Sequence, residues 1–283
     1  MPMSFYYSCH SFVSVLILIM GKFSEFLSFS KEGQEVVPPP SYGDSSTSAR
    51  PLTPPPSFPQ SFGCIHLARS DRIRLIGLPP VVYDDVEQAI LRVWIPGLQG
   101  KFPMYQSYEW KLSGHPWSGQ GAEAVPARRL LCHVLHALSK HGWYLHMSVD
   151  LSKKQYDKDT IILHSVNPQE RYFFSISFNE GDKVRIIDPP SDHVKQAFMT
   201  AVRTWPKGIQ NEREKEPGCY QFKLKGVPWY TSNGDQIIHA RLLSCTILAA
   251  MDSVGFELKG SVDMSTGTSE QANDMDTWFF ASK

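Results

Sequence analysis

The chain has 283 residues, of which 42% are hydrophobic, so it is long enough for two domains with buried cores and is not a wholly disordered protein. Lysine plus arginine and aspartate plus glutamate number 28 each, so the formal net charge is zero. A chain without excess positive charge has no general electrostatic attraction for nucleic acid, and we expect no nucleic-acid partner.

A short apolar stretch at residues 12–20 is the most hydrophobic feature of the N-terminus. It is shorter than the ~20 residues that span a bilayer, and it has neither the basic start nor the cleavage site of a signal peptide. Translation from Met20 would instead expose Gly21 for acylation, although Glu25 stands where serine or threonine is expected. We therefore expect a cytoplasmic protein in which any membrane contact comes through the N-terminus.

Residues 1–61 are predicted to be a disordered segment. Between Lys31 and Ser61 there are eight prolines, six serines and few aliphatic residues, which cannot bury enough surface to offset the entropy of ordering. Within it, Pro39, Pro40 and Tyr42 form a P-P-x-Y sequence, in which the prolines favour the extended polyproline II conformation. This tetrapeptide resembles the ligand of WW domains, which occur in HECT-type ubiquitin ligases; the alternative is an ordinary linker.

The rest of the chain contains an internal duplication, with predicted copies at residues 62–170 and 171–283. The segment from Tyr108 to Trp117 shares six of ten positions with that from Tyr220 to Trp229. The segment from Gly142 to Ser152 shares six of eleven with that from Gly255 to Ser265. Two matches in the same order, at almost the same separation, indicate tandem copies of one domain of ~110 residues.

Hydrophobic periodicity predicts the elements of each copy in chain order. In the first copy strands are expected at residues 64–68, 72–77, 108–113, 143–151 and 159–164, and helices at 83–94 and 127–140. The second copy is expected to begin with a hairpin formed by residues 172–178 and 183–187. The predicted fold class is α+β: two tandem copies, each a mostly antiparallel sheet with two helices on one face. The pattern leaves open whether the two sheets join.

Charged residues recur at matching positions of the two copies. Lys111 matches Lys223, and Arg128 matches Arg241. Aspartates recur at positions 150 and 263, so we predict one helix-to-sheet ion pair per copy, Arg128 with Asp150 and Arg241 with Asp263. The alternative is that the repeated lysines and arginines converge on an anionic group.

A Gly-x-Pro-Trp turn ends in Trp117 in the first copy and in Trp229 in the second. A tryptophan at such a turn either plugs a core or, if exposed, anchors an interface. If both are plugs, their truncation should unfold each copy separately, unless a large shared interface couples the copies. The candidate partner or ligand surface therefore comprises six residues: Lys111, Trp117, Arg128, Lys223, Trp229 and Arg241.

Chemical motifs are sparse. The five cysteines are widely spaced, without the pattern of a disulfide scaffold or a zinc site, and Cys132 and Cys245 are expected to be buried small hydrophobes. His133 and His136 are expected on a solvated helix face, and the second copy has no histidine at the matching positions. We therefore predict no metal site, no cofactor and no catalytic residue.

The preferred hypothesis is a non-catalytic adaptor or scaffold. Its tandem modules would bind a protein partner while the P-P-x-Y sequence recruits a WW-domain protein. The alternative is an enzyme or small-ligand-binding protein with a site between the copies or near the Gly-x-Pro-Trp turns.

Overall fold

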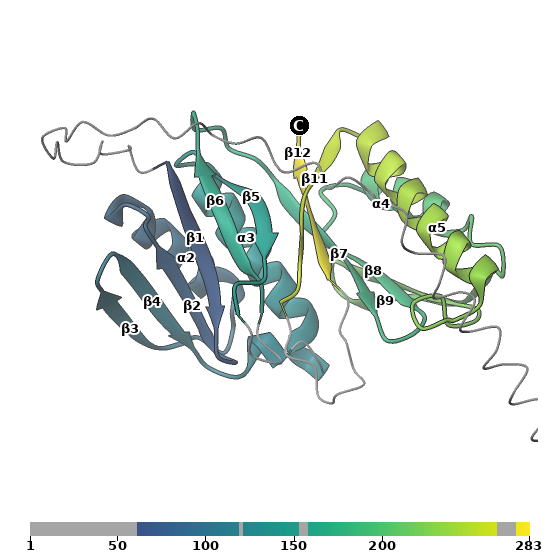
Figure 1. Cartoon of the computed structure of the whole chain (residues 1–283), viewed down its shortest axis with the longest axis horizontal. Coiled ribbons are helices and arrows are strands. Elements are labelled where there is room, and N and C mark those ends of the chain that lie inside the picture. Colours follow the sequence, from purple (N-terminus) through teal and green to yellow (C-terminus); the bar gives the residue numbers. More distant parts are fainter. Residues whose placement is uncertain (1–60, 119–120, 153–157, 265–275) are drawn as a thin grey trace, which may run out of the picture. The chain divides into compact units, whose positions relative to one another are not determined.

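A computed structural model of the chain describes residues 61–118, 121–152, 158–264 and 276–283. Two copies of one α+β unit follow each other along these residues (Figure 1). The first copy comprises β1 (Phe62–Ala68), β2 (Arg72–Ile76), α2 (Tyr83–Val93), β3 (Leu98–Met104), β4 (Ser107–Leu112), α3 (Ala124–Ser139), β5 (Trp143–Val149) and β6 (Thr160–Ser165). The second comprises β7 (Phe173–Asn179), β8 (Lys183–Ile187), α4 (Asp192–Val202), β9 (Ile209–Glu216), β10 (Cys219–Leu224), α5 (Gly234–Ser253), β11 (Phe256–Val262) and β12 (Thr277–Ser282). The P-P-x-Y sequence lies outside the described residues.

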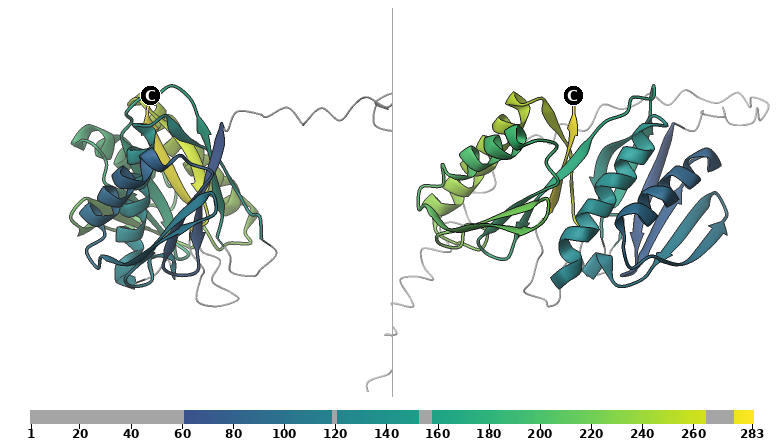
Figure 2. Two further views of the ribbon diagram at one scale, coloured as in Figure 1. Left: turned by 90° about the vertical axis from the view of Figure 1, so that its left-hand side faces the viewer. Right: turned by 180° about the vertical axis from the view of Figure 1, so that it is seen from behind.

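Each copy forms its own six-stranded antiparallel sheet. The strand orders are β3-β4-β2-β1-β6-β5 and β9-β10-β8-β7-β12-β11, so equivalent strands occupy equivalent places. Seen from behind, α2 and α3 lie in front of the first sheet (Figure 2). The predicted fold class of two tandem α+β copies is therefore confirmed, and the two sheets are separate among the described residues.

The edge strands β3 and β9 were not predicted. Their sequences, LQGKFPM and IQNEREKE, are mostly exposed and lack an alternating apolar pattern. Each is held by backbone pairing with β4 or β10 and buries little of its own side-chain surface. Such polar edges, one of them containing proline, resist pairing with further strands and leave no hydrophobic signal in the sequence.

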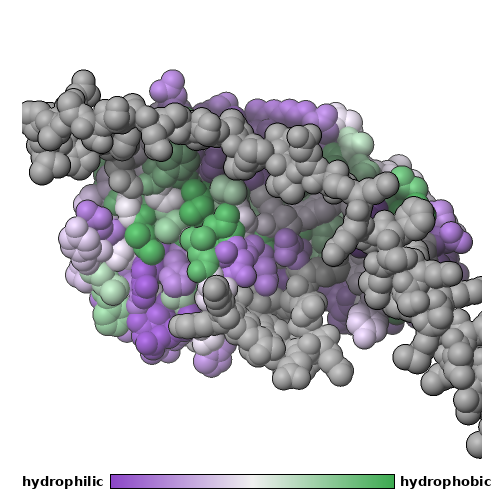
Figure 3. Space-filling model, viewed as in Figure 1, coloured by the Kyte–Doolittle hydropathy of each residue, from purple (hydrophilic) through white to green (hydrophobic). Residues whose placement is uncertain are grey.

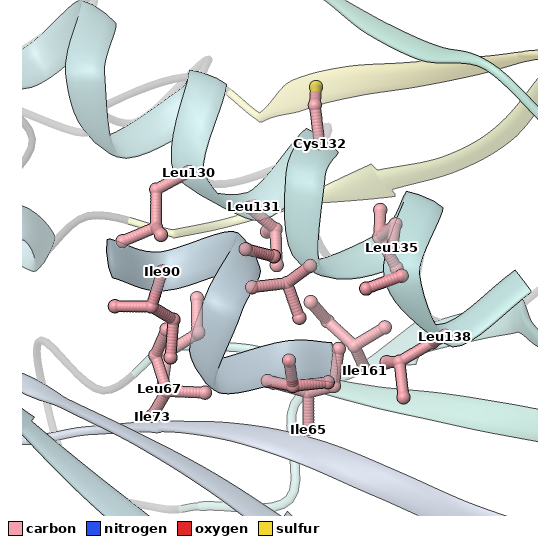
Figure 4. Close-up of a cluster of buried hydrophobic side chains, with 14 of the residues drawn as sticks. Ile65, Leu67, Ile73, Ile90, Leu130, Leu131, Cys132, Leu135, Leu138 and Ile161 are labelled. Carbon is pink, nitrogen blue, oxygen red and sulfur yellow. The ribbon is translucent and has the colours of Figure 1, made fainter. Parts of the chain in front are cut away.

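Helix α3 contributes one face to the core of its own copy. Leu130, Leu131, Leu135 and Leu138 extend from it toward α2 and the first sheet, while Cys132 points away from them (Figure 4). The four leucines recur at helical spacing, so they form a single stripe on one side of α3. All four are at most 1% exposed.

The opposite face of α3 packs against the second sheet. The helix contacts β7 and β8 as well as β5, and one hydrophobic core includes Phe173, Phe279 and Ala281 of the second copy. The predicted solvation of the His133 and His136 face is therefore wrong: both side chains are partly buried, and His136 Nδ1 lies 2.8 Å from the carbonyl oxygen of Arg171. The two copies are joined through a helix that is buried on two sides.

Gly142, which follows α3, provides a test of this backbone path. Its φ of +79° favours glycine, and a Cβ would lie 2.1 Å from the carbonyl oxygen of Val166. We expect Gly142→Ala to destabilise the protein by ~2 kcal/mol or more, because strain and a backbone clash add. The matched control is Gly255→Ala in the second copy, with φ of +88° and open space around the Cβ, which should cost about 1 kcal/mol. Urea unfolding would measure both, and equal losses would contradict the steric argument.

Candidate functional site

Both Gly-x-Pro-Trp turns are structural. Trp117 is 0% exposed, and its indole Nε1 donates to the carbonyl oxygen of Arg72 over 2.9 Å. Trp229 is partly buried, and its Nε1 donates to the carbonyl oxygen of Lys183 over 3.0 Å. Trp117 therefore cannot belong to an exposed partner surface. Its ring fills the end of the core because the turn folds back over the start of β2.

The repeated lysines make equivalent ion pairs. Lys111 Nζ lies 3.9 Å from Asp71 Oδ2, and Lys223 Nζ lies 3.7 Å from Asp182 Oδ2. Lys111 also lies opposite Arg72 in the first sheet, and Lys223 lies opposite Lys183 in the second. Arg72 and Lys183 are the residues whose carbonyl oxygens accept the hydrogen bonds from Trp117 and Trp229. The structure thus brings the predicted lysine and tryptophan together in each copy, in a structural arrangement.

The predicted ion pairs of Arg128 and Arg241 do not form. Arg128 is 2% exposed and donates from Nε to Thr277 Oγ1 of the second copy over 3.0 Å. Asp150 Oδ1 instead accepts from the backbone of Ser152, and Arg241 is exposed with no ion pair to Asp263 in the described part of the chain. The prediction failed because the arginine lies on the helix face that turns away from its own sheet.

Arg129, which sequence reasoning missed, makes an ion pair with two hydrogen bonds between the copies. Its Nε and Nη2 donate to the Asp188 carboxylate over 2.6 and 2.9 Å, and Nη2 also donates to the carbonyl oxygen of Pro217. Glu216 lies 3.4 Å from Nη1. Comparison of the two copies could not have identified Arg129, because the second copy has Leu242 at the equivalent position.

The face of the second sheet that meets α3 is buried throughout. We define this covered face by ten residues, each at most 7% exposed: Phe173, Ser175, Ser177, Arg185, Ile187, Cys219, Gln221, Thr277, Phe279 and Ala281. Helix α3 reaches it through Arg128 at Thr277 and through Val125, which packs with Ile187 and Cys219. In this copy, one face of the sheet therefore binds a helix from outside its own fold.

The equivalent face of the first sheet has no such cover from a described helix. Strand pairing identifies its ten matching residues, in the same order, as Phe62, Cys64, His66, Arg74, Ile76, Ser107, Glu109, Thr160, Ile162 and His164. Eight of these ten are half-buried or exposed, and Phe62 is 45% exposed. We call this surface the open face; Figure 3 shows hydrophobic residues beside hydrophilic ones on the side where its strands lie.

A polar pair crosses both faces at the same register. On the open face, Arg74 Nε donates to Glu109 Oε2 over 2.8 Å; on the covered face, Arg185 Nε donates to Gln221 Oε1 over 2.8 Å. Burial alone would raise the pKa of Glu109, but the hydrogen bonds and charges of Arg72 and Arg74 outweigh it and lower the pKa. The repeated arginine is thus satisfied within its own sheet in each copy.

The thiols of Cys132 and Cys219 are poor nucleophiles. Burial raises the pKa of Cys132 far above that of a free thiol and raises the pKa of Cys219 to about 11. Cys132 is buried as predicted, but Cys245 is exposed, which corrects the prediction for the second copy. Within the described ranges no group of three or more His, Cys, Asp or Glu side chains could hold a metal ion, and no helix is long and apolar enough to cross a bilayer.

Two surface cavities lie at equivalent loops of the copies. One of about 600 Å³ is lined by Gly77, Leu78, Pro79, Gln106, His141, Trp143 and Ser165. One of about 330 Å³ is lined by Pro189, Ser191, Asp192, Lys195, Glu214, Gly218, Cys219 and Tyr220. Neither is lined by Lys111, Trp117 or Arg128, three residues of the candidate ligand surface.

Comparison with known proteins supports the duplication. One domain model matches the chain twice, over residues 61–164 and 172–281, which together make up most of its length. The chain belongs to the family that this domain defines. No curated protein and no solved structure is significantly similar to it.

The shared core predicts that the copies of this family member unfold together. Because Trp117 is fully buried, Trp117→Ala should cost ~3 to 5 kcal/mol. Since residues of both copies belong to one core, hydrogen exchange should show β2 and β8 losing protection in the same transition. The partly exposed equivalent, Trp229→Ala, should cost less. A first copy that melts early while the second keeps the parental midpoint would contradict the coupling.

The lowered pKa of Glu109 predicts that the stability of the protein depends on pH. Because its pKa is lowered in the folded protein, its contribution is present above the unfolded pKa of about 4.3 and is lost as the pH falls. Glu109→Gln should cost ~1 to 3 kcal/mol at neutral pH and flatten the loss of stability below pH ~4.5. Urea midpoints measured across that range provide the test. Glu170→Gln, which removes an exposed carboxylate, is the control, and a parental acid profile in Glu109→Gln would refute the assignment.

Proposed function

We propose that the chain is a non-catalytic adaptor. The tandem domains would bind protein through the open face, and Pro39, Pro40 and Tyr42 would recruit a WW-domain protein. The observation that carries the first half is the use of the same face in the second copy, where the covered face binds α3. A sheet face that already buries a helix in one copy is suited to bind a protein element in the other.

The chemistry of the polar residues supports binding over catalysis. The repeated lysines pair with aspartates, and the repeated indoles donate to backbone carbonyls, so these groups serve the fold. The solid packing around Trp117 weighs against the alternative of a ligand site at the Gly-x-Pro-Trp turn. The proposed adaptor acts inside the cell, where WW-domain proteins would be its partners.

Binding of isolated WW domains tests the recruiting half. We expect the full chain to be retained by a WW domain, and Tyr42→Ala to lower the affinity by at least ~10-fold because the tyrosine fills its own pocket. Pro55→Ala, in a neighbouring proline run that lacks a tyrosine, is the matched control and should bind like the parent. Equal retention of parent and Tyr42→Ala would overturn this half of the proposal.

A further inference from the structure

The contact that α3 makes with the second copy joins two unlike halves, and strands β5 and β11 are in contact beside it. The donor half is the outer face of α3, which carries Val125, Arg128, Arg129 and Cys132. The acceptor half is the covered face of the second sheet. Because the halves differ, each copy of the duplicated domain carries its own version of both.

The second copy carries an unused donor half on α5. This helix is equivalent to α3, and the residues 113 positions after Val125, Arg128, Arg129 and Cys132 all lie on its exposed side: Ile238, Arg241, Leu242 and Cys245. Ile238 is 58% and Leu242 is 56% exposed. A solvated helix face normally carries charged residues, so two large exposed aliphatic side chains one turn apart indicate a docking face.

The first copy carries the second acceptor half, the open face, which no helix of the described residues covers. The aromatic Phe62 matches Phe173, Ile162 matches Phe279, and Ile76 matches Ile187, so three apolar positions of the covered face are kept. Two others are replaced by polar residues, since Ser107 matches Cys219 and His164 matches Ala281. The hydroxyl that accepts from Arg128 is also kept, since Thr160 matches Thr277.

We propose that α5 of one molecule docks on the open face of a second copy of this chain. This contact between molecules is equivalent to the contact that α3 makes within the chain. Arg241 donates to Thr160 Oγ1, and Ile238 packs against Ile76 and Ser107. This inference rests on the proposed function, which assigns protein binding to the open face. The inference names the protein that binds there, a second copy of this chain.

A second copy is favoured over an unrelated partner because the two unused halves belong to one chain. An unrelated partner would explain the open face or the apolar side of α5, whereas a second copy covers both. The contact is heterologous, so a dimer still exposes one donor and one acceptor half, and association continues head to tail into a ring or a filament.

One position makes the contact between molecules weaker than that within the chain. Gly260 of β11 lies against Leu145, and a Cβ there would be 2.5 Å from Leu145 Cδ2. The first copy has Met147 at this position, 47% exposed. The backbone fixes the Cβ of Met147, so the facing leucine, which is Leu258 in the contact between molecules, must move its δ-methyl group aside. The ordering of these two side chains costs entropy, so we expect reversible association.

The two cysteines of the inferred contact provide a direct readout. Cys132 lies beside Ser175 in the contact within the chain. The equivalent residues between molecules are Cys245 and Cys64, of which the first is exposed and the second is partly accessible. Docking therefore brings two thiols from different molecules together.

The first experiment measures mass by sedimentation equilibrium of the full chain. The average mass should rise with concentration in the range of ~1 to 100 µM, and Leu242→Glu should weaken association at least ~10-fold by placing a charge in the contact. Leu91→Glu, which changes an exposed leucine of α2, is the matched control and should associate like the parent. A parent that stays monomeric, or a Leu242→Glu variant that associates like it, would overturn the inference.

Mixing two blocked variants tests the head-to-tail geometry. Leu242→Glu blocks the donor half and Phe62→Glu the acceptor half, so each alone should be monomeric, while an equimolar mixture should stop at dimers. Circular dichroism would verify that both variants are folded. A mixture that stays monomeric, or that associates beyond dimers, would contradict the proposal.

Cross-linking provides a test that needs no charged substitution. In a Cys9→Ser background, oxidation by diamide should give a ladder of disulfide-linked multimers, since each bond uses one thiol from each of two molecules and diamide takes up the two electrons and two protons. Cys64→Ser or Cys245→Ser alone should abolish it, and Cys219→Ser should not. Dimers linked through Cys64 to Cys64 would overturn the proposal. WW-domain binding by Leu242→Glu, which should be parental, reports separately on the proposed function.

Discussion

The two-sided burial of α3 is the constraint on which the rest of the structure depends. One side of the helix supplies leucines to the core of its own copy, and the other supplies Arg128, Arg129 and Cys132 to the second sheet. A buried arginine is tolerated only when its donors are satisfied, and Arg128 meets this condition partly through the hydroxyl of Thr277 and the carbonyl of Ala124. Separation of the copies would expose the apolar surface of this contact, and it would take Thr277 away from Arg128 and Asp188 away from Arg129.

This constraint explains why repeat-equivalent residues behave differently. Cys132 is buried and Cys245 exposed, and Arg128 is buried and Arg241 exposed, although each pair occupies the same place in the domain. The features that are held within one copy are the same in both: the indole of Trp117 donates to the carbonyl oxygen of Arg72 over 2.9 Å, and that of Trp229 donates to the carbonyl oxygen of Lys183 over 3.0 Å. Differences between the copies thus locate the contact between them.

The sequence predicted the elements whose hydrophobic pattern reports burial within one copy, and these include both hairpin strands of the second copy and both helices of the first. It could not predict β3 and β9, which are held by backbone hydrogen bonds that leave no side-chain pattern. Nor could it assign the second face of α3, because polar residues such as His133, His136 and Arg129 are typical of a solvated surface. The prediction of ion pairs for Arg128 and Arg241 failed for the same reason. Hydrophobic periodicity shows that a residue lies outside the apolar stripe of its helix, but it does not show whether another domain covers that residue.

The geometry of an open-ended contact gives the duplication a physical meaning. When one domain docks its helix on the sheet of the next, n copies in a row form n − 1 contacts and always leave one donor and one acceptor half exposed. Covalent linkage raises the effective concentration of the first contact far above that of any contact between molecules, so the internal one tolerates buried polar groups that a weaker contact would not. The second copy accordingly carries the apolar Leu242 where the first carries Arg129 with its three oxygen-bearing partners. An assembly built in this way would display one P-P-x-Y sequence per chain, so a partner with several WW domains would bind the assembly more tightly than a single chain.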